Sequence, residues 1–149
     1  MALGDNPIIA LFDPGDKITA ATAAAVGAGR FVKINAGFQG GPALDLSTPT
    51  SPLTKGNVAQ VAVCGTGQRA FGVTQWDTAA ADDIVGLYCG SQVVPMVADG
   101  AVTAGDIIMS GSAGGAKTWV TAASDANHEL GVAMSTAADT ATVYVKLNL

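Results

Sequence analysis

The end of this sequence alternates apolar and polar residues in the manner of a half-buried β-strand. In the run TATVYVKLNL, residues 140–149, an apolar side chain occupies every second position from Val143 to Leu149. Successive side chains of a strand point to opposite faces, so these apolar residues share one face and Tyr144, Lys146 and Asn148 share the other. The pattern predicts a strand with one buried face.

Similar short runs fill the chain from Asn57 onward. Clusters of Gly, Asp, Ser and Ala separate them at intervals of roughly 8–12 residues, a spacing typical of all-β barrels and sandwiches. The earlier runs are, in order, NVAQVAVCG, RAFGVTQW, IVGLYCG, QVVPMVA, DIIMS, KTWVTA and ELGVAMS. The sequence therefore predicts an all-β fold, a small β-barrel or sandwich of short antiparallel strands.

The chain before Asn57 is less regular. RFVKI, residues 30–34, reads as a strand, whereas KITAATAAAVGAG, residues 17–29, reads as a strand or loop because Thr, Val and Gly weaken a helix there. The stretch between residues 35 and 56 is rich in Pro, Ser and Thr. Because proline interrupts a central ladder, this stretch predicts a long loop.

Residues 1–16 predict an extended N-terminal arm. Its apolar run PIIALF, Pro7–Phe12, is followed by DPGD, in which Pro presets φ and Gly supplies a positive φ for a turn. The apolar run is either the first core strand or an extended segment that pairs with another chain. The remaining residues, 17–149, are predicted to form a single β-rich domain.

Two parts of the chain resemble each other. LTKGNV, Leu53–Val58, and VTAGDI, Val102–Ile107, share a pattern of apolar, Thr, any residue, Gly, Asn or Asp, and apolar. A Gly-Val pair then follows at Gly72 and at Gly131, each with an alanine-rich loop and a second apolar run behind it. Glycine at that point suits a bulge or a tight bend in a strand. We interpret the similarity as a hairpin repeat covering residues 53–90 and 102–149.

Composition and charge narrow the classes of function. Charged residues make up only 13% of the chain, with a net charge of −5, which indicates a surface that partners cover in part. The basic residues are spread from Lys17 to Lys146 without a cluster, which argues against a nucleic-acid partner. No apolar run is long enough to span a membrane, and MALGDNPII lacks the features of a signal peptide.

The two cysteines, Cys64 and Cys89, each lie in an apolar, strand-like run. Buried thiols are therefore favoured over a disulfide. Two cysteines cannot by themselves complete a thiolate zinc site.

Two glycine-rich stretches approach nucleotide-binding motifs without their context. Gly111–Thr118 fits G-x-x-x-x-G-K-T except that Ala116 replaces the second glycine, and TWVTA behind it alternates like a strand instead of opening a helix. Gly65, Gly67 and Ala70 fit G-x-G-x-x-A, but no helix pattern follows. We expect both stretches to be turns, with no nucleotide cofactor.

The titratable residues do not form a recognisable catalytic or metal-binding set. His128, the lone histidine, lies in the polar stretch SDANHE and is expected in a solvated turn. The acidic pairs Asp82–Asp83 and Asp125 with Glu129 lack EF-hand spacing and read as loop acids. The sequence therefore predicts a protein that is not an enzyme and carries no cofactor or metal.

Trp76 and Trp119 stand out because large side chains are scarce in this chain. Such residues stack on sugars, fill a partner's pocket or pack in a core or subunit interface, and the last role is favoured here. Both are kept as candidate partner-binding residues. The arm contributes the other candidates, which are Asn6, Pro7, Ile8, Ile9, Leu11 and Phe12.

The C-terminal third resembles a known family. AVTAGDIIMSG, followed by a short strand and then by ELGVAMSTAADTATVYVKLNL, resembles the small capsid decoration (cement) proteins of tailed bacteriophages. The resemblance is best over Val102–Leu149, weaker over Leu53–Gly90 and diffuse over Met1–Pro52. It implies a β-rich fold without an active site. It also implies a trimer that binds the outer face of an icosahedral shell at three-fold or quasi-three-fold positions.

The resemblance also sets expectations about partners and location. The partners would be the major capsid protein of the shell and other copies of this chain, with no nucleic acid and no membrane. The protein would be made in the host cytoplasm and reside on the outer capsid surface of the virion. Two alternatives stay open: a tail or baseplate structural β-domain, and a carbohydrate-binding module that uses Trp76 or Trp119.

Overall fold

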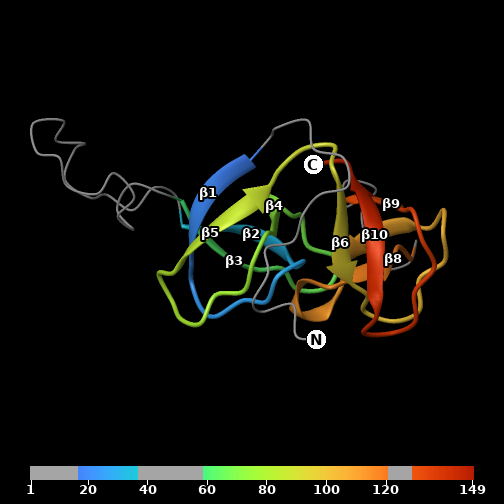
Figure 1. Cartoon of the computed structure of the whole chain (residues 1–149), viewed down its shortest axis with the longest axis horizontal. Coiled ribbons are helices and arrows are strands. Elements are labelled where there is room, and N and C mark those ends of the chain that lie inside the picture. The colour runs from blue at the N-terminus through green and yellow to red at the C-terminus, as the bar shows by residue number, and fades with distance from the viewer. Residues whose placement is uncertain (1–16, 37–58, 121–128) are drawn as a thin grey trace, which may run out of the picture.

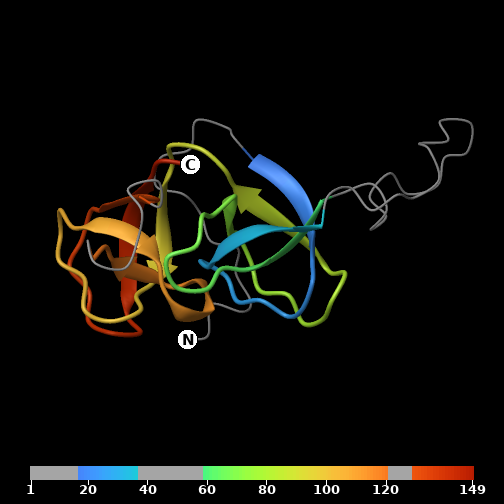
Figure 2. The same ribbon diagram turned by 180° about the vertical axis from the view of Figure 1, so that it is seen from behind.

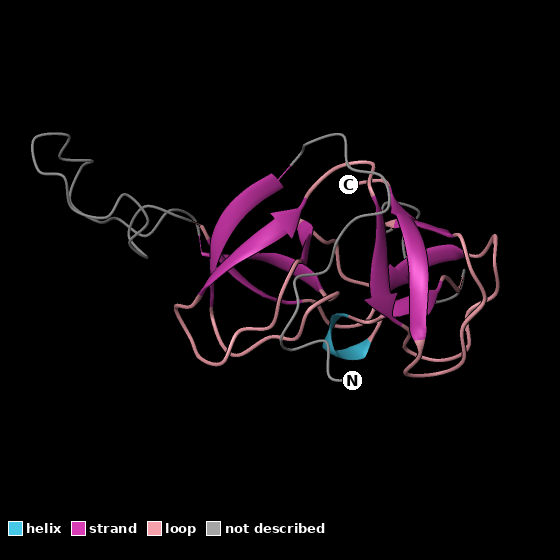
Figure 3. Cartoon of the chain, in the orientation of Figure 1, coloured by secondary structure: helices cyan, strands magenta, loops and turns pink. Residues whose placement is uncertain are grey.

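The computed structural model describes residues 17–36, 59–120 and 129–149, and strands dominate it (Figure 3). The predicted all-β class is confirmed. The predicted arm and most of the Pro/Ser/Thr loop lie outside the described residues. The elements are β1 (Lys17–Thr22), β2 (Phe31–Ala36), β3 (Gln60–Val63), β4 (Gly72–Thr74), β5 (Ile84–Tyr88), β6 (Val93–Val97), β7 (Ile107–Ser110), the 3-10 turn η3 (Ser112–Gly114), β8 (Ala116–Thr118), β9 (Gly131–Ala133) and β10 (Thr142–Leu147).

The strands form two units. The first unit is a closed barrel with the order β1-β3-β2-β4-β5, and the second is a five-stranded sheet with the order β6-β10-β9-β7-β8. The units lie side by side in Figure 1, and the view from behind in Figure 2 shows the same separation. Pro95 lies in β6, at the edge of the second sheet, where a missing backbone N–H is tolerated.

The second unit repeats the strand connectivity of the first. Read from β1 through β5, the first unit has the order β1-β5-β4-β2-β3. The second unit has the order β6-β10-β9-β7-β8, so each strand has a counterpart at the same place in the other unit. The register is the same as well. Phe31 faces Val73 in the first unit, and Ile107 faces Val132 in the second.

The contact that closes the first barrel also has a counterpart. β1 and β3 close the barrel by parallel pairing, in which Thr22 faces Val61. In the second unit a single parallel bridge joins Ala98, just after β6, to Ala116 at the start of β8. The edges of the second sheet therefore meet at the equivalent place, but a single bridge joins them instead of a pair of strands.

The strand register aligns the segment Val102–Ile107 with Val26–Phe31. Gly105 and Gly29 occupy equivalent positions in these segments, VTAGDI and VGAGRF, and both have a positive φ, 94° and 66°. Glycine adopts that backbone conformation without strain, which explains its presence in both turns. The counterpart predicted from sequence, Leu53–Val58, lies outside the described residues.

The two Gly-Val pairs begin equivalent hairpins, β4–β5 and β9–β10. The bulge expected at these glycines is not found, because Gly131 pairs in register with Leu147 and Gly72 with Val32. Close approach explains the glycines instead. A Cβ at Gly131 would overlap the carbonyl oxygen of Lys146, and one at Gly72 would lie 2.9 Å from the Cys89 sulfur.

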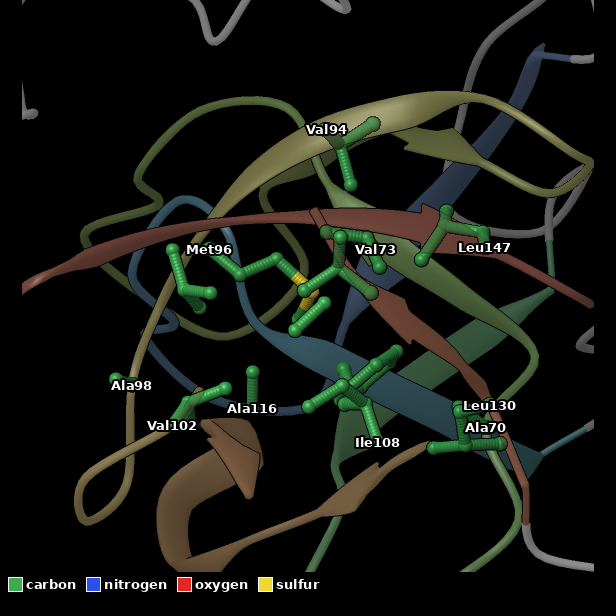
Figure 4. Packing of buried hydrophobic residues seen from close by; sticks show 14 of the residues in the cluster. Ala70, Val73, Val94, Met96, Ala98, Val102, Ile108, Ala116, Leu130 and Leu147 are labelled. Atoms are coloured by element: carbon green, nitrogen blue, oxygen red, sulfur yellow. The ribbon is translucent and has the colours of Figure 1, made fainter. Parts of the chain in front are cut away.

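Two apolar clusters form the core of the described chain. The smaller one fills the first barrel with Ala20, Val26, Val32, Val61, Val85 and Leu87. The larger one joins the outer face of that barrel to the inner face of the second sheet, and Figure 4 shows Val73 of the barrel packed near Met96 and Leu147. Burial of a large apolar side chain contributes roughly 1.5–3 kcal/mol, so this shared cluster fixes one unit against the other.

Candidate interaction surfaces

One row of side chains crosses the outer face of each unit. In the first unit this row is Phe31, Val73 and Tyr88, all at most 2% exposed because the second unit covers them. In the second unit the equivalent row is Ile107, Val132 and Lys146. Ile107 is 39% exposed, whereas its counterpart Phe31 is fully buried.

The uncovered row belongs to a wider apolar surface. Pro95 pairs with Tyr144 in the next row, and the backbone N–H of Met134 donates to the Tyr144 carbonyl oxygen. Tyr144 and Met134 are 37% and 56% exposed. We call this surface the outer sheet face, and its apolar members are Val93, Pro95, Ile107, Val132, Met134 and Tyr144.

The predicted partner-binding residues divide between described and undescribed parts. Asn6, Pro7, Ile8, Ile9, Leu11 and Phe12 all lie outside the described residues. Trp119 lies beside the outer sheet face, where its backbone N–H donates to the Ile107 carbonyl oxygen. Trp76 is 37% exposed in the β4–β5 loop, and its indole N–H donates to the Ile84 carbonyl oxygen at 3.2 Å. The structure places the two tryptophans in different units, not on one shared platform.

A second apolar surface lies at one end of the first barrel. It is an open groove of about 530 Å³ that we call the barrel mouth. Its lining residues come from β1, β2, the approach to β4, the residue after β5 and the C-terminus: Ile18, Lys33, Ile34, Arg69, Ala70, Phe71, Cys89 and Leu149. The sequence did not predict this groove, although Ile18 and Ile34 lie two positions from the buried Ala20 and Val32 and so share their faces of β1 and β2.

The stretch resembling a phosphate-binding loop is a hairpin connection. β7 and β8 pair antiparallel on either side of η3, which confirms the predicted turn. The Asp99 carboxylate accepts from the backbone N–H of Ser112 at 2.7 Å and from its hydroxyl at 3.1 Å. The Asp99 carboxylate therefore already accepts from a backbone N–H group of this turn that a bound phosphate would need, and no helix follows the turn.

The stretch resembling a dinucleotide motif is tied to the second unit. The buried Ser110 hydroxyl accepts from the backbone N–H of Gln68 at 2.9 Å and lies 2.8 Å from the carbonyl oxygens of Gly65 and Gln68. The Gly67 N–H donates to the Ser110 carbonyl oxygen at 2.8 Å. These bonds join the two units, and the loop leads into antiparallel β4 instead of a helix.

The loop acids act as backbone caps. Asp83 accepts from the backbone N–H groups of Ala79 and Ala80, both at 2.9 Å, and Asp139 accepts from that of Gly100 at 2.8 Å. Over residues 17–36, 59–120 and 129–149, no group of three metal-ligating side chains comes together. His128 and Asp125 lie outside these ranges.

Cys64 is buried, and its thiol donates to the carbonyl oxygen of Arg69 at 3.7 Å. Burial raises the pKa of this thiol to about 11, and the nearby Lys33 ammonium opposes the rise. No disulfide joins Cys64 and Cys89, but Cys89 is half-buried at the barrel mouth, so the predicted burial is found at Cys64 and not in full at Cys89. The two thiols therefore differ in access to solvent.

The raised pKa of Cys64 predicts an alkaline loss of stability. Between pH 9 and pH 11 the unfolded chain releases this proton and the folded chain keeps it, so the free energy of unfolding should fall as pH rises. The full effect of such a shift is about 2–3 kcal/mol. Urea unfolding across this range would measure it. Cys64→Ala should show a shallower pH dependence, and equal slopes in both proteins would contradict the assignment.

No helix in the described part of the chain has the length and apolarity needed to cross a membrane. This agrees with the strand-rich architecture.

Comparison with known proteins gives a family match and a solved structure of similar fold. The sequence matches the family described as phage cement protein over residues 12–147. The structure resembles the N base of head fiber gp8.5 of bacteriophage phi29, with a TM-score of 0.63 and 16% sequence identity over 89% of this chain and 92% of the other. At that identity the likeness concerns the fold alone. A search of curated protein sequences finds no match.

Proposed function

Because this chain belongs to the phage cement protein family, with a match over residues 12–147, we propose that it decorates and stabilises the outer surface of a tailed-phage icosahedral capsid. It is a structural protein of the phage capsid. The finer role is our proposal: a homotrimer at three-fold and quasi-three-fold positions that contacts the major capsid protein. The family match is the observation that carries it.

The fold and surfaces support this role. The phi29 protein whose fold it shares is a head fiber base, which favours attachment to a phage head over a tail. The outer sheet face offers a broad apolar surface in a chain with few charges, as a subunit or shell contact requires. A trimer would engage three sites at once, so modest contacts per copy would add up to firm attachment. The net charge of −5 fits a position outside the shell.

The arm is proposed as a second attachment element. Asn6–Phe12 would add a strand to the shell protein or to a neighbouring subunit, with main-chain hydrogen bonds supplying affinity and alternate side chains supplying register. Trp119, at the margin of the outer sheet face, and Trp76 are the other proposed contacts.

Deletion of Met1–Phe12 tests the proposal. We expect the truncated protein to keep its circular dichroism spectrum and a cooperative thermal transition but to lose attachment to purified capsids that lack the decoration protein. Occupancy would be measured by imaging and by co-sedimentation of capsids with bound protein. A chain in which the same residues are replaced by Gly and Ser is the matched control for length, and it should fail in the same way.

Three outcomes would contradict parts of the proposal. Full occupancy by the truncated protein would remove the arm from the attachment surface. Absence of capsid binding by the full chain would reject decoration as the function. A hexamer in a mass measurement in solution would favour the tail or baseplate alternative over a trimer.

A further inference from the structure

The barrel mouth exposes an apolar surface that continues the barrel core. Ile18 lies two positions from the buried Ala20 in β1, and Ile34 lies two positions from the buried Val32 in β2, so both share the inward face. Yet Ile18 and Ile34 are 42% and 43% exposed. The core of the first unit thus opens onto solvent at one end.

The lining of the mouth defines the chemistry of an occupant. Ile18, Ile34, Phe71 and Leu149 supply apolar contacts, whereas the charged lining residues, Lys33 and Arg69, are both cations. No Asp or Glu side chain lines the mouth in the described chain, and the carboxylate of Leu149 is a main-chain group. An extended apolar segment flanked by acidic residues therefore fits the mouth best.

The chain contains such a segment immediately before β1. Pro7–Phe12 is almost wholly apolar, and Asp5, Asp13 and Asp16 flank it. The mouth-lining residue Ile18 is only six positions after Phe12. The linker of residues 13–16 spans up to about 14 Å when extended.

The linker also has the residues needed to reverse the chain. The DPGD sequence is typical of a β-turn, because proline at the second position presets φ and glycine at the third permits the positive φ of a type II turn. A reversal there would direct Pro7–Phe12 back toward the start of β1. Attachment through so short a linker gives an effective concentration on the order of millimolar, which favours the chain's own segment over that of a second copy.

We propose that the barrel mouth is a docking site for the chain's own Pro7–Phe12 segment. Apolar residues of the segment cover Ile18 and Ile34, and the flanking aspartates lie near Lys33 and Arg69. Docking keeps the apolar arm covered until the protein meets its partner. The site is a property of the isolated chain, and it does not require capsid attachment.

Cys89 provides a native reporter for this docking because it lines the mouth. We expect iodoacetamide to alkylate Cys89 at least about tenfold faster in a chain lacking Met1–Phe12 than in the full chain, a ratio that corresponds to about 1.4 kcal/mol of docking free energy. The rate would be followed by peptide mass spectrometry. Cys64 should stay slow in both proteins, which would show that the barrel remains folded.

Matched substitutions separate docking from a general effect of the arm. Leu11→Asp in the full chain should raise the Cys89 rate nearly as much as the deletion, whereas Leu3→Asp, outside the segment, should leave it unchanged. A synthetic peptide of residues 5–13 added to the truncated chain should restore protection of Cys89. Equal Cys89 rates in the full and truncated chains would overturn the proposal.

A disulfide test identifies the occupant. Leu11→Cys, oxidised by glutathione disulfide, should form a bond with Cys89 within one chain and run as a monomer on a non-reducing gel. Disulfide-linked dimers or trimers would show that a second copy supplies the segment and would overturn the same-chain proposal. Protection of Cys89 that appears only after capsids are added would also overturn it, because the shell would then be the occupant.

Discussion

Replacing Phe31 by alanine is expected to lower the free energy of unfolding by about 3–5 kcal/mol. Phe31 is fully buried in the cluster that joins the first barrel to the second sheet. Its removal leaves a cavity between the units, and the strands on either side are fixed by their ladders and cannot collapse into it. Urea unfolding followed by tryptophan fluorescence would measure the loss.

The register of the two units supplies a matched control for this substitution. Ile107 is the equivalent residue of the second unit, but it lies on the outer sheet face with 39% of its surface exposed. Ile107→Ala should therefore cost no more than about 1 kcal/mol. Similar losses in both variants would mean that the second unit does not cover the barrel as described. Lower capsid occupancy with Ile107→Ala would add support for the outer sheet face as a contact.

Replacing Gly131 by alanine is expected to destabilise the fold by about 3 kcal/mol or more. The added Cβ would overlap the carbonyl oxygen of Lys146 and lie 2.9 Å from a methyl carbon of Val145. A backbone oxygen cannot turn aside as a side chain does, so β9 and β10 would have to separate. The thermal midpoint and urea midpoint of the variant would measure the effect.

Two other glycines serve as controls for Gly131. A Cβ at Gly27 would have its nearest neighbours at 3.7 Å, an ordinary contact, so Gly27→Ala should change stability by less than about 0.5 kcal/mol. Gly72, the counterpart of Gly131, should give an intermediate loss, because the Cys89 sulfur at 2.9 Å can shift and the Tyr88 carbonyl oxygen lies at 3.0 Å, less close than the Lys146 oxygen at Gly131. A loss at Gly131 no larger than that at Gly27 would contradict the close approach of β9 and β10.

The strands and the fold class were predictable because local alternation encodes them. In β10, Val143, Val145 and Leu147 are all fully buried, as their spacing predicts. The nucleotide-like stretches could also be recognised as turns, because strand patterns follow them. These conclusions depend on neighbours in sequence and needed no knowledge of which strands pair.

The full structural similarity between the two units could not be predicted from the amino-acid sequence alone. Sequence comparison selects Leu53–Val58 as the relative of Val102–Ile107 because both contain Thr and Gly at the same spacing. The strand register aligns Val102–Ile107 with Val26–Phe31, where the shared feature is a glycine of positive φ. Backbone conformation, more than residue identity, is what the two segments have in common.

The barrel mouth was hidden from sequence analysis for a different reason. Ile18, Ile34 and Cys89 are distant in sequence and meet only because β3 pairs with both β1 and β2 while β5 pairs with β1. The parallel pairing of β1 with β3 is a long-range event that no local pattern announces. The exposed apolar character of the mouth likewise depends on where the barrel ends.

Because the second unit covers the outer row of the first, the two ends of the molecule differ. The outer row of the first unit is capped by its successor in the same chain, whereas the matching row of the second unit has no successor among the described strands. If further units were added by the same contact, unlike surfaces would meet at each step. Such head-to-tail contacts either close into a ring or continue as a filament. A third unit fused after β10 would find this row exposed, in the position where the second unit covers the first.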